Sequence, residues 1–444
     1  MAFAAASVLV APVRLGAQDT LSLDRALQEA VAQNASLKAA RAGADAEASR
    51  VSEAQARWFP QVTFAETWQR GDQPVFVFSS LLSSRQFAAA NFAIDALNHP
   101  DPTGFFRSTI SIGQVLYDGG ARTSAIDAAT LRHEIAQHTT DEASAAVVLA
   151  TAQSYGRVLV AEAGQRAADA AVQAAREDLA RAERRRDMGL ATDADVLALV
   201  AHVATLQQRA IQHRGDAAVA RAELNQLTGA PITRDFLVLL PSVPDTGHQS
   251  TEIRALLAEA DSTRPELRRA AASLRLAEAD KKGVRAALLP QVAAQAAIDV
   301  SGTSFDDRAS SWIVGGEVRW TFSLGGADLA RSKAASHAHA RAIAEAEAVR
   351  GAVHVEVATA FRRLEAAHAR HSVARAAVDQ ARESHRITRN RFEAGLAGVT
   401  DVLRASSAVV DAETQRIDAA VDALVSEAML SRAVGRKPGM RDQP

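Results

Sequence analysis

The side chains best suited to chemistry in this 444-residue sequence are its 12 histidines, set among 52 acidic residues. Glu365 and His368 have the Glu-x-x-His spacing that places two metal ligands on one helix face, and His371 follows one turn later. A di-metal bundle needs a second such motif, and the equivalent earlier segment, residues 158–162, contains no histidine. We therefore interpret these histidines as solvated, interpret His213 as a packed polar residue, and expect no metal site and no cofactor.

Motifs for covalent chemistry are also missing. The sequence has no glycine-rich phosphate loop, no nucleophile elbow with a Ser–His–Asp order and no His-Glu-x-x-His. Without cysteine it has no disulfide, thiolate metal site, cysteine nucleophile or lipid anchor on an N-terminal cysteine. With 50 basic and 52 acidic residues, the formal net charge is −2, which leaves no basic footprint for nucleic acid. We expect neither an enzyme nor a nucleic-acid-binding protein.

An internal duplication organises the chain. The matching positions, each 206 residues apart, are Gly119 with Gly325, Gly189 with Gly395, and Asp195 with Asp401. Upstream, Pro290 lies 230 positions after Pro60, so the first copy carries 24 extra residues before Gly119. Several landmarks at one offset indicate a tandem repeat.

Each copy predicts the same order of elements: a helix, two strands, a very long helix and a shorter helix. The ranges are 21–57, 58–68, 107–118, 121–188 and 192–228, then 252–288, 290–300, 311–324, 327–394 and 398–434. The domain organisation is then a signal peptide at 1–17, a first repeat at 18–229, a linker or equatorial segment at 230–251, a second repeat at 252–435 and a C-terminal tail at 436–444. Residues 236–240 suggest a short strand, and the apolar segment 69–106 suggests a structured loop.

The helices have the features of long coiled-coil walls. No proline interrupts residues 121–188 or 327–394, and 68 residues make a helix of roughly 100 Å. The following helix repeats apolar residues at alternating spacings of three and four, as a coiled-coil seam does. The seam positions are Val196, Leu199, Val203, Leu206, Ala210, His213, Ala217, Ala220, Leu224 and Leu227.

The strands alternate apolar and polar residues over about ten positions, which is typical of transmembrane β-strands. Trp312, Val314 and Val318 alternate with Ser311 and Glu317, for example. A half-buried soluble sheet gives the same alternation. If the strands lie in a membrane, four cannot close a barrel, so several chains must pool them: two would give eight strands and three would give twelve.

These features together resemble the TolC-type outer-membrane efflux protein family, the outer membrane factors. The resemblance rests on the tandem copies, Leu-Tyr-Asp-Gly-Gly at 116–120, Phe-Ser-Leu-Gly-Gly at 322–326, Leu-Pro-Gln-Val at 289–292, and Glu-Ala-Gly-Leu-Ala at 393–397 followed by Asp-Val-Leu. It implies a mainly α fold with a small β part. A homotrimer would share one 12-stranded transmembrane β-barrel, four strands per chain, and a long α-helical coiled-coil barrel in the periplasm. One departure is Asn34-Ala35, where the second copy has Arg264-Pro265.

The resemblance also implies a function and partners. The chain would be the outer-membrane channel of a tripartite efflux or export system, a passive conduit working with a periplasmic adaptor and an inner-membrane resistance-nodulation-division (RND) or ABC pump. It would lie in the outer membrane of a Gram-negative-type bacterium, with a large periplasmic part. A type I protein-secretion conduit remains an alternative, as does a periplasmic coiled-coil structural protein.

The turns between the long and short helices are the candidate docking sites. They are Gly189, Leu190 and Ala191 in the first copy and Gly395, Leu396 and Ala397 in the second. Each glycine fits a helix C-terminal position that needs positive φ. The resemblance implies that such tips meet the adaptor, and plain helix-capping turns are the alternative.

Asp195 and Asp401, one turn into the short helices, are candidates for an acidic entrance. In a trimer they would place six carboxylates near the narrowing pore and favour cations. The resemblance implies a gate closed by side-chain links; here Phe392 stands where tyrosine is common, Ala397 where a basic residue can stand, and Arg404 one turn past Asp401. Alternatively, both aspartates simply stabilise helix N-termini.

Overall fold

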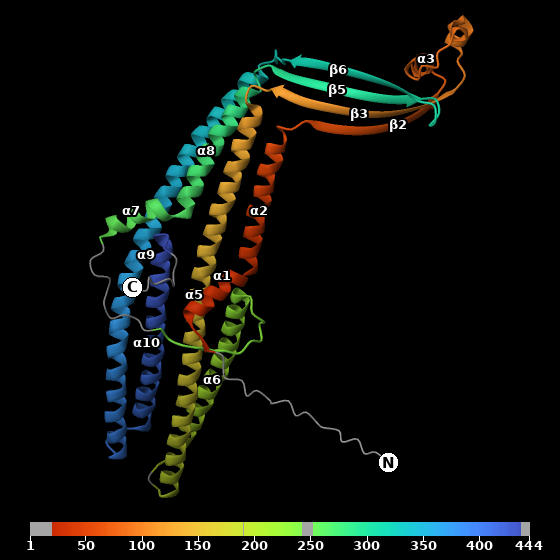
Figure 1. The fold of residues 1–444 in the computed structure, drawn as a ribbon. Coiled ribbons are helices and arrows are strands. Elements are labelled where there is room, and N and C mark those ends of the chain that lie inside the picture. Colours follow the sequence, from red (N-terminus) through yellow and green to blue (C-terminus); the bar gives the residue numbers. More distant parts are fainter. Residues whose placement is uncertain (1–19, 190, 242–251, 437–444) are drawn as a thin grey trace, which may run out of the picture. The chain divides into compact units, whose positions relative to one another are not determined.

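A computed structural model describes residues 20–189, 191–241 and 252–436 of the chain (Figure 1). The predicted signal peptide, Leu190, residues 242–251 of the linker and most of the tail lie outside the described residues. The chain divides into two compact units. One consists of Met1–Ala42, His138–Arg268 and Ala348–Pro444, and the other of Gly43–Gln137 and Arg269–Glu347.

Two helical hairpins, one from each repeat, supply most of the first unit. They are α5 (Ala121–Asp187) with α6 (Asp193–Thr228), and α9 (Ala327–Glu393) with α10 (Val399–Ala433) (Figure 1). All four helices end within one residue of the predicted bounds. The α6 seam is confirmed as well, because all ten of its positions except the half-buried His213 and Leu227 are buried.

Close approach between helices depends on glycine. A Cβ atom added at Gly156 of α5 would lie 2.5 Å from Cγ1 of Val421 in α10, and one at Gly164 would lie 3.0 Å from Nδ1 of His213. The His213 ring thus packs against a bare stretch of α5 backbone, which supports the prediction of a packed polar residue. Larger side chains at either glycine would push the helices apart.

The helices predicted at 21–57 and 252–288 are each two helices, so the expectation of one continuous helix was wrong. The first breaks at Asn34 into α1 (Leu23–Gln33) and α2 (Ala35–Ala56), and the second at Arg264 into α7 (Ile253–Thr263) and α8 (Pro265–Ala286). Both residues at the breaks are extended, with ψ of 128° and 124°.

The two breaks have different local causes. The Asn34 side-chain oxygen accepts the N–H groups of Ser36 and Leu37 at 3.0 and 3.3 Å, which caps α2. Arg264 precedes Pro265, which disfavours helical geometry in the residue before it. Asparagine therefore does in the first repeat what the Arg-Pro pair does in the second.

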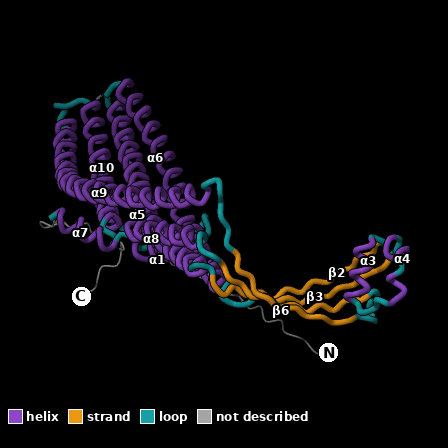
Figure 2. Tube along the Cα trace, turned by 90° about the horizontal axis from the view of Figure 1, so that it is seen from above, coloured by secondary structure: helices purple, strands orange, loops and turns teal. Residues whose placement is uncertain are grey.

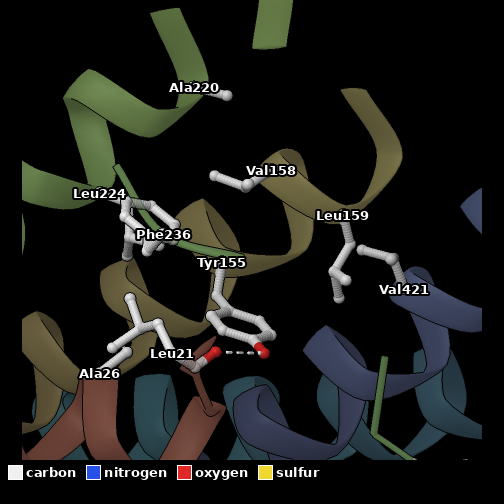
Figure 3. Close-up of a cluster of buried hydrophobic side chains, with 9 residues drawn as sticks. All are labelled: Leu21, Ala26, Tyr155, Val158, Leu159, Ala220, Leu224, Phe236 and Val421. Atoms are coloured by element: carbon white, nitrogen blue, oxygen red, sulfur yellow. Dashed lines mark hydrogen bonds between the residues drawn. The ribbon is translucent and has the colours of Figure 1, made fainter. Parts of the chain in front are cut away.

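A cluster of buried side chains surrounds Tyr155 of α5, which has no exposed surface (Figure 3). The Tyr155 hydroxyl lies 2.7 Å from the carbonyl oxygen of Leu239 and 3.0 Å from that of Leu21, and it accepts the Leu239 N–H at 3.0 Å. These contacts fix two short parallel strands, β1 (Thr20–Leu21) and β4 (Leu237–Val238). β4 lies within the strand predicted at 236–240.

The second unit contains one four-stranded antiparallel sheet in the order β2-β3-β5-β6 (Figure 1). The strands are β2 (Gln61–Gly71), β3 (Thr103–Tyr117), β5 (Gln291–Gly302) and β6 (Ala309–Arg319). β6 therefore ends five residues before the predicted residue 324. Each repeat supplies one neighbouring pair of strands, as the duplication predicts.

The register places apolar residues in rows across the sheet. Phe64, Ile110, Ile298 and Trp312 are successive partners in one such row, with exposed fractions of 67%, 47%, 53% and 78%. The next row on this face is Val62, Ile112, Ala296 and Val314. Intervening rows carry mostly polar residues, such as Thr63 and Ser111. The sheet therefore has an apolar face and a polar face.

The segment 69–106 is structured, as predicted. It contains α3 (Pro74–Ser83), a 3-10 turn η1 (Ala89–Phe92) and α4 (Ile94–Asn98), which lie near the ends of the strands (Figures 1 and 2). Its aromatic rings stack edge to face, with centroids 4.8 Å apart for Phe78 and Phe87 and 5.0 Å apart for Phe87 and Phe92. We refer to residues 72–102 as the insert.

Replacing Tyr155 with Phe should lower the free energy of unfolding by about 1–3 kcal/mol, because the buried Leu21 carbonyl and the partly buried backbone groups of Leu239 would lose their partner. The measurement is thermal unfolding followed by circular dichroism in detergent. Tyr117→Phe is the matched control, because Tyr117 is the other tyrosine of the chain and is 49% exposed. Equal melting temperatures for the two variants would contradict the role given to the hydroxyl.

Candidate functional site

The two hairpin tips have the backbone geometry that the sequence predicts. Gly189 and Gly395 have φ of +73° and +75°, in the left-handed region that favours glycine. At the second tip, the Gly395 N–H donates to the Phe392 carbonyl at 3.0 Å and the Leu396 N–H donates to the Arg391 carbonyl at 2.8 Å. This pair of bonds is a Schellman motif, which satisfies carbonyl groups that the end of α9 would leave free.

The side chains at the tips differ in exposure. Leu396 is 71% exposed, whereas Ala191 and Ala397 are half-buried. Leu190 lies outside the described residues. Because its side chain is mostly exposed, Leu396 is an apolar group that the fold of this chain does not require for packing.

Asp195 belongs to a capping box at the start of α6. Its Oδ2 accepts the Thr192 hydroxyl at 2.7 Å and the Thr192 N–H at 3.0 Å, while the Asp195 N–H donates to the Thr192 hydroxyl at 3.2 Å. The bond from the Thr192 hydroxyl, followed by the one from its N–H, lowers the pKa of the Asp195 carboxyl below its usual value. Asp195 is thus a negative charge held at a helix N-terminus.

Asp401 occupies the same position at the start of α10, with a weaker cap. Its Oδ2 accepts the Gly398 N–H at 3.3 Å, and glycine has no hydroxyl to return a second bond. Arg404 lies on the next turn, with its Nη1 3.6 Å from Oδ1 of Asp401. Both groups are largely exposed, so this ion pair is weak.

The two hairpins meet near their tips. The Arg185 guanidinium of α5 lies 5.2 Å from the centre of the Phe392 ring of α9, within the range of a cation–π contact. Below it, Val196 and Leu199 of α6 are buried in a cluster that includes Leu403 of α10. The structure thus brings Phe392 to an arginine of the other repeat.

Two residues at this site were not identified from the sequence. Thr192 was identifiable, because Thr-x-x-Asp before an apolar helix is a capping-box pattern. Arg185 carries no such signal, because its contact joins residues that are 207 positions apart.

The structure also bears on metal binding and on membrane spanning. Within residues 20–189, 191–241 and 252–436, no three histidine or acidic side chains lie close enough to hold a metal ion. No helix in the same part of the chain is both long enough and apolar enough to cross a membrane.

The chain thus combines long paired helices in tandem with a four-stranded sheet that exposes an apolar face. The sequence matches the outer membrane efflux protein family over residues 26–230 and 256–436, and the chain belongs to this family. No curated protein matches the chain significantly.

Solved structures show the same fold at low sequence identity. The CmeC outer membrane channel of Campylobacter jejuni is 14% identical with a TM-score of 0.80, covering 93% of this chain and 85% of that one. The outer membrane protein VceC of Vibrio cholerae is 20% identical with a TM-score of 0.73, covering 93% and 96%. The MtrE outer membrane channel of Neisseria gonorrhoeae, in its open state, is 17% identical with a TM-score of 0.73, covering 93% and 89%.

Replacing Thr192 with Val should loosen the start of α6, because a lost N-cap destabilises a helix end by about 1 kcal/mol. Backbone amides at 193–196 should exchange with deuterium roughly fivefold faster at pH 7. Because the pKa of Asp195 is lowered, the cap contributes fully above the unfolded value of about 4 and is lost as pH falls through the folded value. The part of the difference that comes from the bond between the Thr192 hydroxyl and the carboxylate should therefore vanish in acid, whereas the part from the Asp195 N–H bond to that hydroxyl should remain.

Hydrogen exchange read by mass spectrometry, corrected for the intrinsic rates at each pH, measures both effects. Thr205→Val is the control, because Thr205 is an exposed threonine in the interior of α6. An unchanged exchange rate at 193–196 in the Thr192 variant would show that the capping box does not hold this tip.

Proposed function

We propose that this protein is the outer-membrane channel of a tripartite efflux or export system, acting as a passive conduit without enzymatic activity. Family membership supports the channel class. The trimer, the adaptor, an RND or ABC pump in the inner membrane and the large periplasmic part are our proposals for this chain. The pump would largely select the cargo, so the channel would need only to supply a water-filled passage with a continuous wall.

The observation that carries the proposal is the exposed sheet. Among the described residues, no strand pairs with the outer side of β2 or of β6, and one face presents rows of exposed apolar side chains. Apolar rows next to open edges are unfavourable in water, and open edges are also unfavourable in lipid. Pairing β6 of one copy with β2 of the next satisfies both constraints, and three copies would close a 12-stranded barrel.

The sheet's two faces then have separate tasks. The face with Phe64 and Trp312 would contact lipid, and the face with Thr63, Ser111 and Asp299 would line the water-filled interior. In a closed barrel every backbone group of the strands is paired, which the isolated chain cannot achieve.

We further propose that the hairpin tips dock the adaptor. The exposed Leu396 side chain and the tightly closed backbone at Gly189 and Gly395 support this proposal. An adaptor that packs on an apolar tip gains contact area without unfolding the Schellman motif.

Asp195 and Asp401 are proposed to set the charge of the periplasmic entrance, with Phe392 and Arg404 beside them. In a trimer, six carboxylates at a narrowing pore would attract cations. The capping contact of Asp195 and the ion pair of Asp401 with Arg404 leave the first aspartate as the stronger contributor.

The first test is the mass of the protein extracted from outer membranes in mild detergent, measured by light scattering after size exclusion. We expect three chains, each of 46.9 kDa before removal of a signal peptide. A monomer that stays soluble without detergent would instead mean a structural protein with an ordinary sheet, and the channel proposal would fail.

Leu396→Asp should reduce export at least about tenfold, because it would bury an unpaired carboxylate in the proposed interface in place of an exposed apolar side chain. The trimer and its thermal stability should be unchanged, since Leu396 is mostly exposed. The measurement is accumulation of a fluorescent pump substrate in cells. Leu329→Asp, an equally simple change at a 62% exposed position near the start of α9, is the control. Normal export by the Leu396 variant would refute docking through this tip.

A further inference from the structure

The insert packs on one particular face of the sheet. Val77, Ser80 and Ser84 are at most 5% exposed. The Phe76 ring lies edge-on to Phe105 of β3, with centroids 6.3 Å apart, and the Ser301 hydroxyl of β5 donates to the Ser83 carbonyl at 3.3 Å.

The register identifies that face as the polar one. Ser301 pairs with Arg107, and Phe105 lies two residues before Arg107 on the same strand, so all three side chains leave the same face. Asp299 and its partner Thr109 extend this face along the strands. Under the proposed function this face lines the water-filled interior, so α3 lies inside the barrel mouth.

The other side of α3 is apolar and uncovered. Val75 and Leu82, seven residues or two turns apart, lie opposite the buried positions and are 78% and 50% exposed. Phe92 and Ile94, further along the insert, are 66% and 79% exposed. A soluble surface would carry polar residues here, so these side chains require a covering partner.

The insert is firmly held in this position. The Arg85 guanidinium donates to the Ser310 carbonyl of β6 at 3.0 Å. The Gln86 side chain bonds Asp307 at 2.6 Å and accepts the Thr303 hydroxyl at 2.6 Å, both in the turn between β5 and β6. The insert follows β2 but is anchored at the opposite edge of the sheet, so it crosses the strand ends.

We propose that the partner is the same insert in the other copies. Three inserts would pack across the threefold axis through Val75 and Leu82 and narrow the outer mouth of the channel. This inference rests on the proposed trimer. The helices join the strands at one end of the barrel, and the proposed constriction lies at the other end.

The dimensions allow this contact. Twelve strands about 4.8 Å apart and tilted by about 40° give a barrel circumference of roughly 75 Å and a radius of about 12 Å. A helix with its side chains is about 10–12 Å across, so α3 lying against the wall extends most of the way to the axis.

Because the chain has no cysteine, single substitutions give an unambiguous test. Val75→Cys and Leu82→Cys are introduced separately, and each purified protein is oxidised in detergent and run on a non-reducing gel. We expect disulfide dimers in up to about two thirds of the chains, because one sulfur in each threefold set is left without a partner. Val314→Cys is the matched control, since it is 69% exposed on the apolar face and should stay monomeric on the gel.

The outcomes separate the two proposals. A trimeric mass with no cross-link at position 75 or position 82 would overturn the constriction and leave the channel proposal intact. A monomeric mass would overturn both. As a second measurement, replacing residues 74–99 by a short Gly-Ser linker should raise single-channel conductance in planar bilayers. An unchanged conductance in a trimeric deletion variant would also count against the constriction.

Discussion

Each peptide group on the edge of a sheet needs a hydrogen-bonding partner, and lipid offers none. In this chain the edges are β2 and β6, and the apolar rows between them rule out water as the preferred surroundings. The other features follow from this constraint. Under the proposed function the sheet would pair with other copies of the chain, symmetry would relate those copies, and the paired helices would form a wall with the same symmetry.

The long helices can be predicted from the sequence because their signal is periodic and uninterrupted. Val196, Leu206 and Leu224 repeat on one stripe of α6, and glycines with positive φ stand where α5, α6 and α9 end. The strands can also be predicted from the sequence, since Phe64 and Trp312 alternate with polar neighbours. The register brings these two residues into one row. The strand bounds were less exact: β2 lies three residues further along the chain than predicted, β3 begins four residues earlier, and β6 ends five residues earlier.

The features that the sequence did not predict depend on contacts between distant residues or on a single side chain. The break at Asn34 arises because its amide caps α2 and also donates to the Leu227 carbonyl, 193 positions away. Nothing in the pattern around residues 21–57 indicates that contact. The Arg185–Phe392 contact and the position of the insert on the polar face are of the same kind. Thr192 is different, since its capping pattern is local and was available.

The unequal caps at Thr192 and Gly398 have a mechanical consequence. In the proposed trimer, duplication would give the wall six near-equivalent sectors, of which threefold symmetry would make only every second one identical. Three α6 starts would be closed by a reciprocal side-chain bond, and three α10 starts would rely on one backbone bond and an exposed ion pair. A ring built in this way is weakest at alternate sectors. If its periplasmic end widened, the three α9–α10 hairpins would move outward first. The opening would then be triangular before it became circular.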